Sequence, residues 1–556
     1  MEIVLNDKSC KCNAGETVLE VAKRNNIFIP TLCYLKNVCE ESSCRICVCE
    51  VDGRLRPVCS LLVEDGMVVK TESEKVLNSR KHTLQLFLEN HHRNCNQCQK
   101  NHDCDLQNLF ELYNILPERH DFYKVEVDNS SPCVTRDDSK CILCNKCAKI
   151  CANTQSVHAL TKQQRGYKTF MGCAFDSELR HSTCVGCGQC TLVCPTGALV
   201  EHSELDQVTQ VLTTEKIVIA QVAPSVRVSL AEAFSNPIGT FDEGRMVTAL
   251  KKIGFKYVFD VNLGADFTVI EESKELLERV KSGKDLPLFS SCCPAWFKFV
   301  QNFYPDYANH ISSCKSPTEM LGAIIKNYYS KKLGVSADDI VVVGIMPCTA
   351  KKGEKQRGKD VDFVLTTREL AKLIKLFDID YNNLPSSPFD SPLSYYSGAG
   401  LIFGATGGVT EAVLRNVLSQ LDPQNTQIDF ENVRKSDGRK EVEISAKNTK
   451  LHLCIVNGLA NARKVMEDIA SGKKHYDFVE VMACPGGCVN GGGQIYVDYQ
   501  KINIQDVKLA RANSLYQKDK HMKERKSSQN TSMQQIYDDF FIPSPQMAKQ
   551  LLHYRH

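Results

Sequence analysis

The chain has 556 residues, and its 68 lysines and arginines nearly balance 66 aspartates and glutamates, for a formal net charge of +2. This length exceeds what one core fills, so three or more domains are expected, and the small net charge gives no general attraction for nucleic acid. The N-terminus lacks the basic and apolar regions of a signal peptide, and no apolar run approaches the roughly 18–20 residues that cross a bilayer. These features predict a cytoplasmic protein without nucleic-acid or membrane partners.

Cysteine is the unusual component, with 28 residues, most of them in tight C-x-x-C groups. Disulfide scaffolds suit short secreted chains, whereas in a reducing cytosol such groups indicate metal binding. Zinc is the first alternative to iron–sulfur clusters, because C-x-x-C pairs also bind tetrahedral zinc. The spacing of the cysteines decides between the two.

The N-terminal segment has the pattern of a small ferredoxin-like domain. Residues 2–5 read as a strand and residues 15–27 as a helix, in which Thr17 and Glu20 have capping-box spacing. The cysteines that follow fit a 2Fe-2S site, and the candidate ligands are Cys33, Cys44, Cys47 and Cys59.

One alternative at this site stays open. Cys39 competes with Cys33, because Cys39, Cys44 and Cys47 have the plant-type C-x4-C-x2-C spacing. Three further cysteines are surplus, and a buried or idle thiol is the expected state of Cys10, Cys12 and Cys49.

The stretch "LENHHRNCNQCQKNHDC" contains three cysteines, one short of the ligands of a cluster. These are Cys95, Cys98 and Cys104. His91 stands four residues before the first of them, one helical turn away, so it can converge on the same metal. His91 is therefore the predicted fourth ligand of a 4Fe-4S cluster, with His92 and His102 as rivals.

Two copies of the bacterial ferredoxin run C-x2-C-x2-C-x3-C follow, at 141–151 and 184–194. In the two-cluster arrangement the fourth cysteine of each run binds the other run's cluster. A zinc site has no use for a third cysteine at this spacing, so two 4Fe-4S clusters are predicted. The expected ligand sets are Cys141, Cys144, Cys147 and Cys194 for one cluster, and Cys151, Cys184, Cys187 and Cys190 for the other.

From about residue 209 onward, strand-like apolar runs alternate with amphipathic helical patterns. This predicts a large α/β domain with mostly parallel strands, in which sites form beyond the carboxyl ends of strands. The later cysteines follow that rule, because they come directly after the runs "LPLFSS", "VVVGIMP" and "FVEVMA". One site built from three separate loops is therefore expected, and it contains Cys292, Cys293, Cys348, Cys484 and Cys488.

Two glycine-rich stretches, "GATGGV" and "CVNGGGQ", invite a nucleotide interpretation. Neither has the G-x-G-x-x-G pattern that opens a βαβ unit, and no G-K-[ST] follows. Close approach of the backbone to a cluster explains these glycines better. No nucleotide or flavin site is predicted.

The three cysteine stretches, "SSCCPAW", "IMPCTAKK" and "MACPGGCVNGGGQ", resemble the signature stretches of FeFe-hydrogenases, in the same order. The resemblance extends over essentially the whole chain, including a front end of four clusters as in the monomeric clostridial type. It implies five segments: a 2Fe-2S β-grasp domain at 1–78, a His/Cys 4Fe-4S segment at 79–120, a two-cluster ferredoxin-like domain at 121–208, a catalytic domain at 209–505, and a small-subunit-like tail at 506–556. It also favours Cys33, because "IPTLCY" is similar to the loop that opens this site in the family.

The active site implied by this resemblance is the H-cluster, a 4Fe-4S cubane joined to a two-iron unit with CO, cyanide and azadithiolate. The cubane ligands would be Cys293, Cys348, Cys484 and Cys488, with Cys488 bridging to the two irons. Side chains around the two-iron unit would include Pro224, Ser225, Lys351, Met346 and Met482, although ordinary core packing explains the methionines equally well.

The resemblance also implies a proton relay that begins at Cys292. Glu272, Glu275 and Arg279 have i, i+3, i+7 spacing, which places them on one face of a helix. The implied relay runs outward from Cys292 through Glu272, Ser312, Glu275 and Arg279. Two nearby features depart from the pattern: Thr318 stands where many relatives carry glutamine, and Cys314 is an extra cysteine interpreted as structural.

The implied activity is reversible 2H⁺ + 2e⁻ ⇌ H₂, with electrons exchanged with ferredoxin and with maturation proteins supplying the two-iron unit. The alternatives are a non-catalytic relative, either a hydrogen sensor or a cluster-handling protein, and a pure electron-transfer subunit. The retained Cys292 and the three intact stretches favour the enzyme. No role is predicted for Cys133, Cys173 and Cys454.

Overall fold

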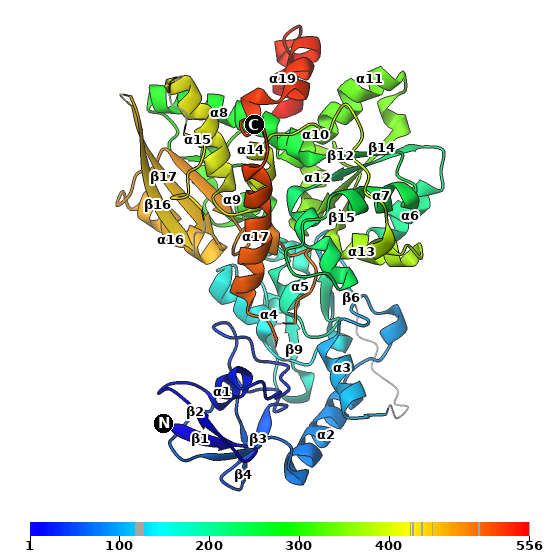
Figure 1. Cartoon of the computed structure of the whole chain (residues 1–556), viewed down its shortest axis with the longest axis vertical. Helices are drawn as coiled ribbons and strands as arrows, with labels where there is room; N and C mark the ends of the chain where they lie inside the picture. Colours follow the sequence, from blue (N-terminus) through cyan, green and yellow to red (C-terminus); the bar gives the residue numbers. More distant parts are fainter. Residues whose placement is uncertain are drawn as a thin grey trace.

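The computed structural model describes residues 1–116, 127–422, 424, 427–434, 438–447, 449–498 and 501–554, so the predicted boundary between 120 and 121 lies outside the described residues. Figure 1 shows an elongated molecule with the N-terminal module at its lower end. The cyan segment lies in the middle, and the large α/β part with the C-terminal helices forms the upper end. The order of the modules in space thus follows their order along the chain.

The first module is a five-stranded mixed sheet with one helix. The strand order is β2-β1-β5-β3-β4, and β1 with β5 is the parallel pair among otherwise antiparallel neighbours. The predicted helix is α1 (Val18–Arg24), and Thr17 and Glu20 form the predicted capping box. The strands are β1 (Glu2–Leu5), β2 (Lys8–Lys11), β3 (Val48–Val51), β4 (Arg54–Pro57) and β5 (Val68–Lys70).

The second and third modules are small and rich in turns. After α2 (Glu74–Glu89) and α3 (Asp105–Leu112), the two cysteine runs lead into α4 (Lys146–Lys149) and α5 (Gln189–Val193). Each of these short helices begins after a residue in the left-handed region, Asn145 (φ 69°) or Gly188 (φ 69°), so the sequence repeat is also a backbone repeat. The small strands are β6 (Val127–Asp128), β7 (Val134–Asp137), β8 (Thr161–Gln163), β9 (Phe170–Gly172) and β10 (Leu199–Glu201).

The upper part contains two four-stranded sheets. The first has the order β12-β11-β14-β15, and all its pairs are parallel. The second has the order β13-β18-β17-β16, parallel except at β16. The strands are β11 (Ile217–Val222), β12 (Tyr257–Asp260), β13 (Leu288–Phe289), β14 (Ile340–Met346), β15 (Phe363–Thr366), β16 (Arg439–Ala446), β17 (Thr449–Asn457) and β18 (Phe478–Met482).

Seven of these strands coincide with the apolar runs that predicted strands, whereas β16 was not predicted. The runs are "KIVIAQVA", "KYVFDV", "LPLFSS", "DIVVVGIM", "VDFVLTT", "HLCIVNG" and "FVEVMA". Its sequence, "RKEVEISA", carries only two large apolar residues between charged ones, because it is an edge strand that pairs on one side with β17. Charged side chains are common on edges, where they discourage pairing with another chain.

The long helix α8 (Val261–Ser282) separates the two cores. Val261 and Phe267 pack into the core around the first sheet, whereas Val269 and Leu276 pack into the core that contains β17 and β18. The other helices are α6 (Leu205–Leu212), α7 (Gly244–Ile253), α9 (Pro294–Phe303), α10 (Pro317–Ile324), α11 (Ser330–Leu333), α12 (Ala350–Gly358), α13 (Thr367–Leu376), α14 (Gly398–Leu401), α15 (Gly408–Leu421), α16 (Leu459–Ala470), α17 (Ile504–Lys520), α18 (Thr531–Ile536) and α19 (Pro545–Leu552).

Three predicted segment boundaries fall inside helices. The boundary after residue 78 lies within α2, the one after 208 within α6, and the one after 505 within α17. A helix is held by its own backbone hydrogen bonds, so the chain passes between these segments without an extended linker.

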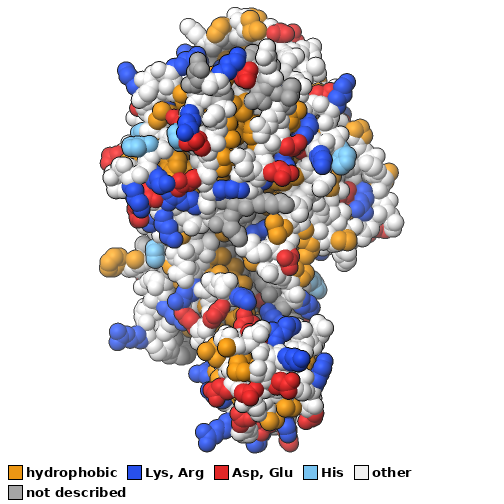
Figure 2. Space-filling view, turned by 60° about the vertical axis from the view of Figure 1, so that its left-hand side comes forward, with side chains coloured by type: hydrophobic (Ala, Val, Ile, Leu, Met, Phe, Trp, Pro, Cys, Tyr) orange, Lys and Arg blue, Asp and Glu red, His pale blue; other side chains and the backbone are white. Residues whose placement is uncertain are grey.

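The molecular surface carries both charge signs. Lysine and arginine side chains are interspersed with aspartate and glutamate on the face in Figure 2. Among the described residues, no helix combines the length and apolarity needed to cross a membrane.

Candidate functional site

A cavity lies at the carboxyl ends of strands from both sheets. It is reached from β11 by Pro224 and Ser225, from β14 by Cys348, and from the second sheet by the segments that follow β13 and β18. The expected three loops thus meet, together with the β11 loop. The lining includes Pro224, Ser225, Cys292, Cys293, Thr318, Met346, Cys348, Lys351, Met482, Cys484 and Cys488.

The adjacent cysteines at 292 and 293 have different surroundings. Cys293 is the N-cap of α9 and packs against the core that contains Trp296, whereas Cys292 packs against the core that contains Met482. Burial raises the pKa of the Cys292 thiol well above its ordinary value. Cys292 is therefore a thiol that holds its proton, facing the cavity.

The polar groups of this cavity are few and paired. Lys351 Nζ donates to Glu354 Oε2 at 2.6 Å, and although burial opposes its charge, Glu354 raises the pKa of Lys351 above the ordinary value. Ser225 Oγ is 3.5 Å from the carbonyl oxygen of Gly404. Thr318 places its hydroxyl 3.5 Å from Met346 Sδ. The remaining lining is apolar.

Three of the predicted relay residues, Ser312, Glu275 and Arg279, are directly connected. Ser312 Oγ donates to Glu275 Oε2 at 2.8 Å, and Arg279 pairs with Glu275 Oε1 at 2.6 Å. Glu272 accepts from the Ser291 N–H at 3.3 Å, while its other carboxylate oxygen is buried without a hydrogen-bond partner among the described residues. Burial, then the charge of Glu275, raises the pKa of Glu272 to about 8, so this carboxyl is protonated at neutral pH.

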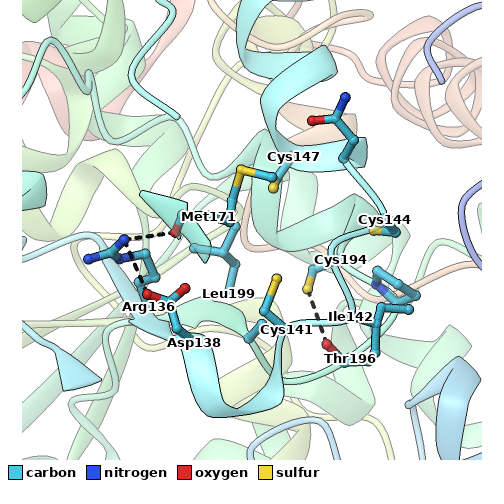
Figure 3. A pocket seen from close by; sticks show the side chains of 13 residues that line it. Arg136, Asp138, Cys141, Ile142, Cys144, Cys147, Met171, Cys194, Thr196 and Leu199 are labelled. Carbon is cyan, nitrogen blue, oxygen red and sulfur yellow. Dashed lines mark hydrogen bonds and ion pairs between the residues drawn. The ribbon is translucent and has the colours of Figure 1, made fainter. Parts of the chain in front are cut away.

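Each ferredoxin run closes around its own cavity, with one cysteine exchanged. One cavity is lined by Cys141, Cys144 and Cys147 of the first run and by Cys194 of the second, and Figure 3 shows their sulfur atoms around a shared space. The other cavity is lined by Cys184, Cys187 and Cys190 together with Cys151. The side chains therefore have the predicted crossed arrangement.

The sulfur atoms of these two groups are spread more widely than the ligands of a single zinc ion. Tetrahedral Zn–S bonds of about 2.3 Å would hold the sulfurs roughly 3.8 Å apart. Among the described residues, only one group of three His, Cys, Asp or Glu ligand atoms lies within 4.8 Å, and it consists of the carboxylates of Glu411, Asp429 and Asp519. These carboxylates form ion pairs with Arg415, Arg434 and Arg525, so the group is a salt-bridge network. No three of the cysteine sulfurs that line these two cavities lie that close together.

The N-terminal module resolves which cysteines share a site. The thiol of Cys33 contacts those of Cys44 and Cys59, and the thiol of Cys47 also contacts Cys59. Cys39 points elsewhere, with its sulfur 3.6 Å from the carbonyl oxygen of Cys144. Long-range packing against the ferredoxin run takes Cys39 out of the group, which spacing alone did not decide.

His91 differs from its two rivals in burial. It is 7% exposed, whereas His92 and His102 lie on the surface. Burial lowers the pKa of His91 to about 4, which keeps the ring neutral, and its Nδ1 is buried without a hydrogen-bond partner among the described residues. A neutral imidazole with a free nitrogen fits a metal ligand.

Comparisons with known proteins agree with this geometry. A family model described as the iron-only hydrogenase large subunit, C-terminal domain, matches residues 216–492. Models for a 2Fe-2S cluster-binding domain, an NADH-ubiquinone oxidoreductase-G iron–sulfur binding region, a 4Fe-4S dicluster domain and an iron hydrogenase small subunit match 1–74, 80–119, 140–198 and 505–556.

Two curated relatives match the whole chain. The NADP-reducing hydrogenase subunit HndD of Solidesulfovibrio fructosivorans is 40% identical over 100% of this chain and 98% of its own length, and iron hydrogenase 1 of Clostridium pasteurianum is 37% identical over 100% and 99%. A solved apo FeFe-hydrogenase from Chlamydomonas reinhardtii has a TM-score of 0.57 at 34% identity, covering 64% of this chain and 98% of that one.

The chain belongs to the iron-only, or FeFe-, hydrogenase family. It is an oxidoreductase that interconverts protons and H₂ at an H-cluster, with 2Fe-2S and 4Fe-4S clusters in N-terminal modules. The expected multidomain fold, with ferredoxin-like modules before a large α/β catalytic domain, is confirmed.

One residue at the hydrogenase site was not anticipated. Cys187 lines the catalytic cavity as well as the cavity of the second ferredoxin run, so the two sites share a wall. The loops meet because Gly492 packs on the Cys187 backbone, where a Cβ would lie 2.3 Å from the Cys187 carbonyl oxygen. The glycines of "CVNGGGQ" thus allow this loop to pack closely against the loop of Cys187, a contact that no short motif predicts.

The surplus cysteines of the hydrogenase are all buried. The core of the N-terminal module contains Cys10, Cys12 and Cys49. A second core contains Cys133 and Cys173, and two further cores contain Cys314 and Cys454, respectively. Burial explains these side chains as ordinary small apolar groups.

Proposed function

We propose that this hydrogenase carries four accessory clusters, one 2Fe-2S and three 4Fe-4S, which pass electrons along the chain to the catalytic cavity. The proposed ligands are Cys33, Cys44, Cys47 and Cys59; His91, Cys95, Cys98 and Cys104; Cys141, Cys144, Cys147 and Cys194; and Cys151, Cys184, Cys187 and Cys190. The observation that carries this proposal is the pair of cavities lined by four cysteines each, with one exchanged between the runs. Low-potential clusters suit electron transfer to protons.

The proposed holders of the active-site cubane are Cys293, Cys348, Cys484 and Cys488, with Cys488 also holding the two-iron unit. The cavity they line is largely apolar, and Lys351 is the buried cation that faces it, which suits a group with anionic ligands. The H-cluster supplies the metal chemistry, and maturation proteins would supply its two-iron unit. Ser225, Pro224, Met346 and Met482 would surround it.

The proposed proton route leads from Cys292 to the surface. Cys292 holds a proton at the cavity, and Glu272 is a neutral acid that can replace this proton once Cys292 has given it up. In the reverse direction, Glu272 must first release its own proton outward before it can accept one from Cys292. Ser312 then links to Glu275, and Arg279 compensates the charge of Glu275 close to solvent. The thiol, carboxyl and hydroxyl groups of this route can each accept and donate a proton, as a reversible reaction requires, whereas Arg279 only balances charge.

Ferredoxin is the proposed electron partner. The proposed N-terminal 2Fe-2S cluster would have the reduction potential of plant-type ferredoxin clusters, about −400 mV, which suits electron exchange with ferredoxin. The name of the Solidesulfovibrio relative favours a second candidate, NADP, although this chain has no G-x-G-x-x-G motif of its own. The high cysteine content supports a reducing, cytoplasmic location. The five segments defined in the sequence analysis are also the proposed domains of the chain.

The test of the active site is an infrared spectrum of anaerobically matured protein. Intrinsic CO and cyanide bands are expected, and Cys488→Ala should lose them because the two-iron unit is no longer retained. A matched variant, Cys314→Ala, removes a buried thiol outside the cavity and should keep the bands. Absence of the bands from the unsubstituted protein would refute the proposed H-cluster ligands.

The test of the electron partner compares two donors at equal potential. Hydrogen evolution is expected with reduced ferredoxin and the isolated chain, whereas NADPH alone should support none. Turnover with NADPH by the isolated chain would reverse this assignment.

A further inference from the structure

Lys100 is a buried cation that the proposed hydrogenase mechanism does not use. Its side chain is 3% exposed, and its Nζ donates to the carbonyl oxygen of Cys194 at 2.9 Å. Asp105 attracts it only at longer range, and no carboxylate among the described residues forms an ion pair with it. Taking an ammonium out of water is unfavourable unless negative charge lies nearby, so its position requires an explanation.

The ammonium lies where the loops of two proposed cluster sites are in contact. It belongs to the loop between Cys98 and Cys104, and its hydrogen bond reaches Cys194 of the neighbouring site. The loops touch at Gly197, where an added Cβ would lie 2.4 Å from Cys98 Sγ and 3.6 Å from Lys100 Cβ. The Asp105 N–H and the Cys104 thiol also donate to the carbonyl oxygen of Pro195, at 2.9 and 3.5 Å.

An aromatic ring holds the ammonium from the other side. Lys100 Nζ lies 3.3 Å from the centroid of the Tyr496 ring, and the Arg368 guanidinium lies 4.3 Å from the same centroid. Arg368 is itself neutralised by the buried carboxylate of Glu201. Cation–π attraction helps to hold Lys100 in place but supplies no formal negative charge. The counter-charge of Lys100 must come from elsewhere.

We propose that Lys100 is an internal counter-ion shared by the His91/Cys95/Cys98/Cys104 cluster and the Cys141/Cys144/Cys147/Cys194 cluster, and that it raises the reduction potential of the second. The inference rests on the ligand sets proposed above. Thiolate-ligated clusters carry net negative charge that grows by one on reduction, and nearby positive charge stabilises the reduced form. Lys100 would act on the cluster through its charge, since it contacts the backbone of the ligand Cys194 and no reacting atom.

Removal of the charge should make the second cluster harder to reduce. In Lys100→Met, the ratio of reduced to oxidised cluster at a fixed potential is expected to fall about tenfold, which for a one-electron couple is about 59 mV. Lys100→Arg keeps the charge and should return the ratio most of the way. The measurement is a redox titration of the full-length matured protein followed by electron paramagnetic resonance, with iron content determined on the same samples.

Lys140 provides the matched control. It adjoins Cys141 and also lies against Gly197, but its Nζ is paired with Asp137 at 2.8 Å. Lys140→Met therefore removes a charge that is already balanced, and a much smaller change is expected. An equal change in both variants would show that any nearby lysine suffices and would overturn the proposal.

Two further outcomes count against the counter-ion role. Unchanged reduction in Lys100→Met at full iron content would show that the charge is not felt by the cluster. Loss of iron from both Lys100→Met and Lys100→Arg would make the lysine a structural residue. Failure of the ligand sets themselves is distinguishable, because the unsubstituted protein would then lack the cluster signals.

Discussion

At the residue scale, the adjacent cysteines at 292 and 293 show how one backbone step separates two tasks. Their side chains pack against different cores although both line the cavity, so Cys293 is available as a proposed cubane ligand while Cys292 keeps its proton. Neighbouring residues in an extended segment point to opposite sides, which made this division foreseeable from the sequence.

The first prediction concerns the proton carrier. Cys292→Ser should keep the iron content and the infrared bands, because Cys292 is not a proposed ligand. Hydrogen turnover should fall about 100-fold or more, since a serine hydroxyl is a much weaker acid than a thiol and proton transfer of this kind contributes that magnitude. Undiminished turnover in an anaerobic assay would contradict the relay.

The second prediction concerns Glu272. Burial raises its pKa to about 8, so its carboxyl should be protonated at pH 7 and ionised at pH 9. The carbonyl-stretch band of a protonated carboxyl should disappear with a midpoint near pH 8, and this band should be missing from Glu272→Gln. Glu319, whose pKa burial also raises to about 8, is present in both proteins and cancels in the difference. A difference spectrum without a pH-dependent band would contradict the prediction.

At the element scale, the two ferredoxin runs use the same turn with different residues. The left-handed positions are Leu143 and Asn145 in the first run, and Gly186 and Gly188 in the second. Both turns direct backbone N–H groups at sulfur: the Leu143 N–H to Cys141, and the Gly186 N–H to Cys184, each at 3.4 Å. Such bonds stabilise thiolates, so the turn serves cluster binding in both runs.

The third prediction tests the exchange of the fourth cysteine. Cys194→Ala should lose about four iron atoms, the content of one 4Fe-4S cluster. Adding Cys141→Ala should remove no more, because both belong to the same proposed cluster, whereas adding Cys184→Ala should roughly double the loss. The reverse pattern of iron content would place Cys194 with its own run.

At the scale of the whole molecule, a buried ion pair joins the ferredoxin-like module to the catalytic domain. Arg368, on α13, pairs with Glu201, on β10, at 2.8 Å, and also donates to the carbonyl oxygen of Gly492 at 2.8 Å. The side chains of Arg368 and Glu201 are 3% and 0% exposed. This contact lies beside the loop that brings Cys187 to the catalytic cavity, so it supports the contact between the two sites.

The fourth prediction concerns this interface. Arg368→Met should destabilise the protein by about 3–5 kcal/mol, because Glu201 is left charged and buried, and Arg368→Met with Glu201→Met should recover much of the loss. Lys372 is the control: it lies 3.6 Å from the same carboxylate but is 31% exposed, so Lys372→Met should cost about 1 kcal/mol or less. Anaerobic thermal unfolding would measure all four proteins. Equal effects of the two single substitutions would contradict the buried-pair argument.

Most of the fold could be predicted because its signals are local. The strands β11, β14 and β18 are apolar runs followed by site residues, and the capping box at Thr17 announces α1. The edge strand β16 could not be predicted in this way, because its charged sequence forms a strand only when β17 provides a partner.

The sequence by itself determined which chemistry is possible, since cysteine spacing within a loop decides how many thiols can meet one cluster. Tertiary structure decided what spacing left open: Cys39 points to Cys144, His91 is the buried histidine, and Lys100 lies between two sites. These outcomes depend on contacts between segments far apart in the chain. Their physical reason is packing and the cost of burial, neither of which a short motif contains.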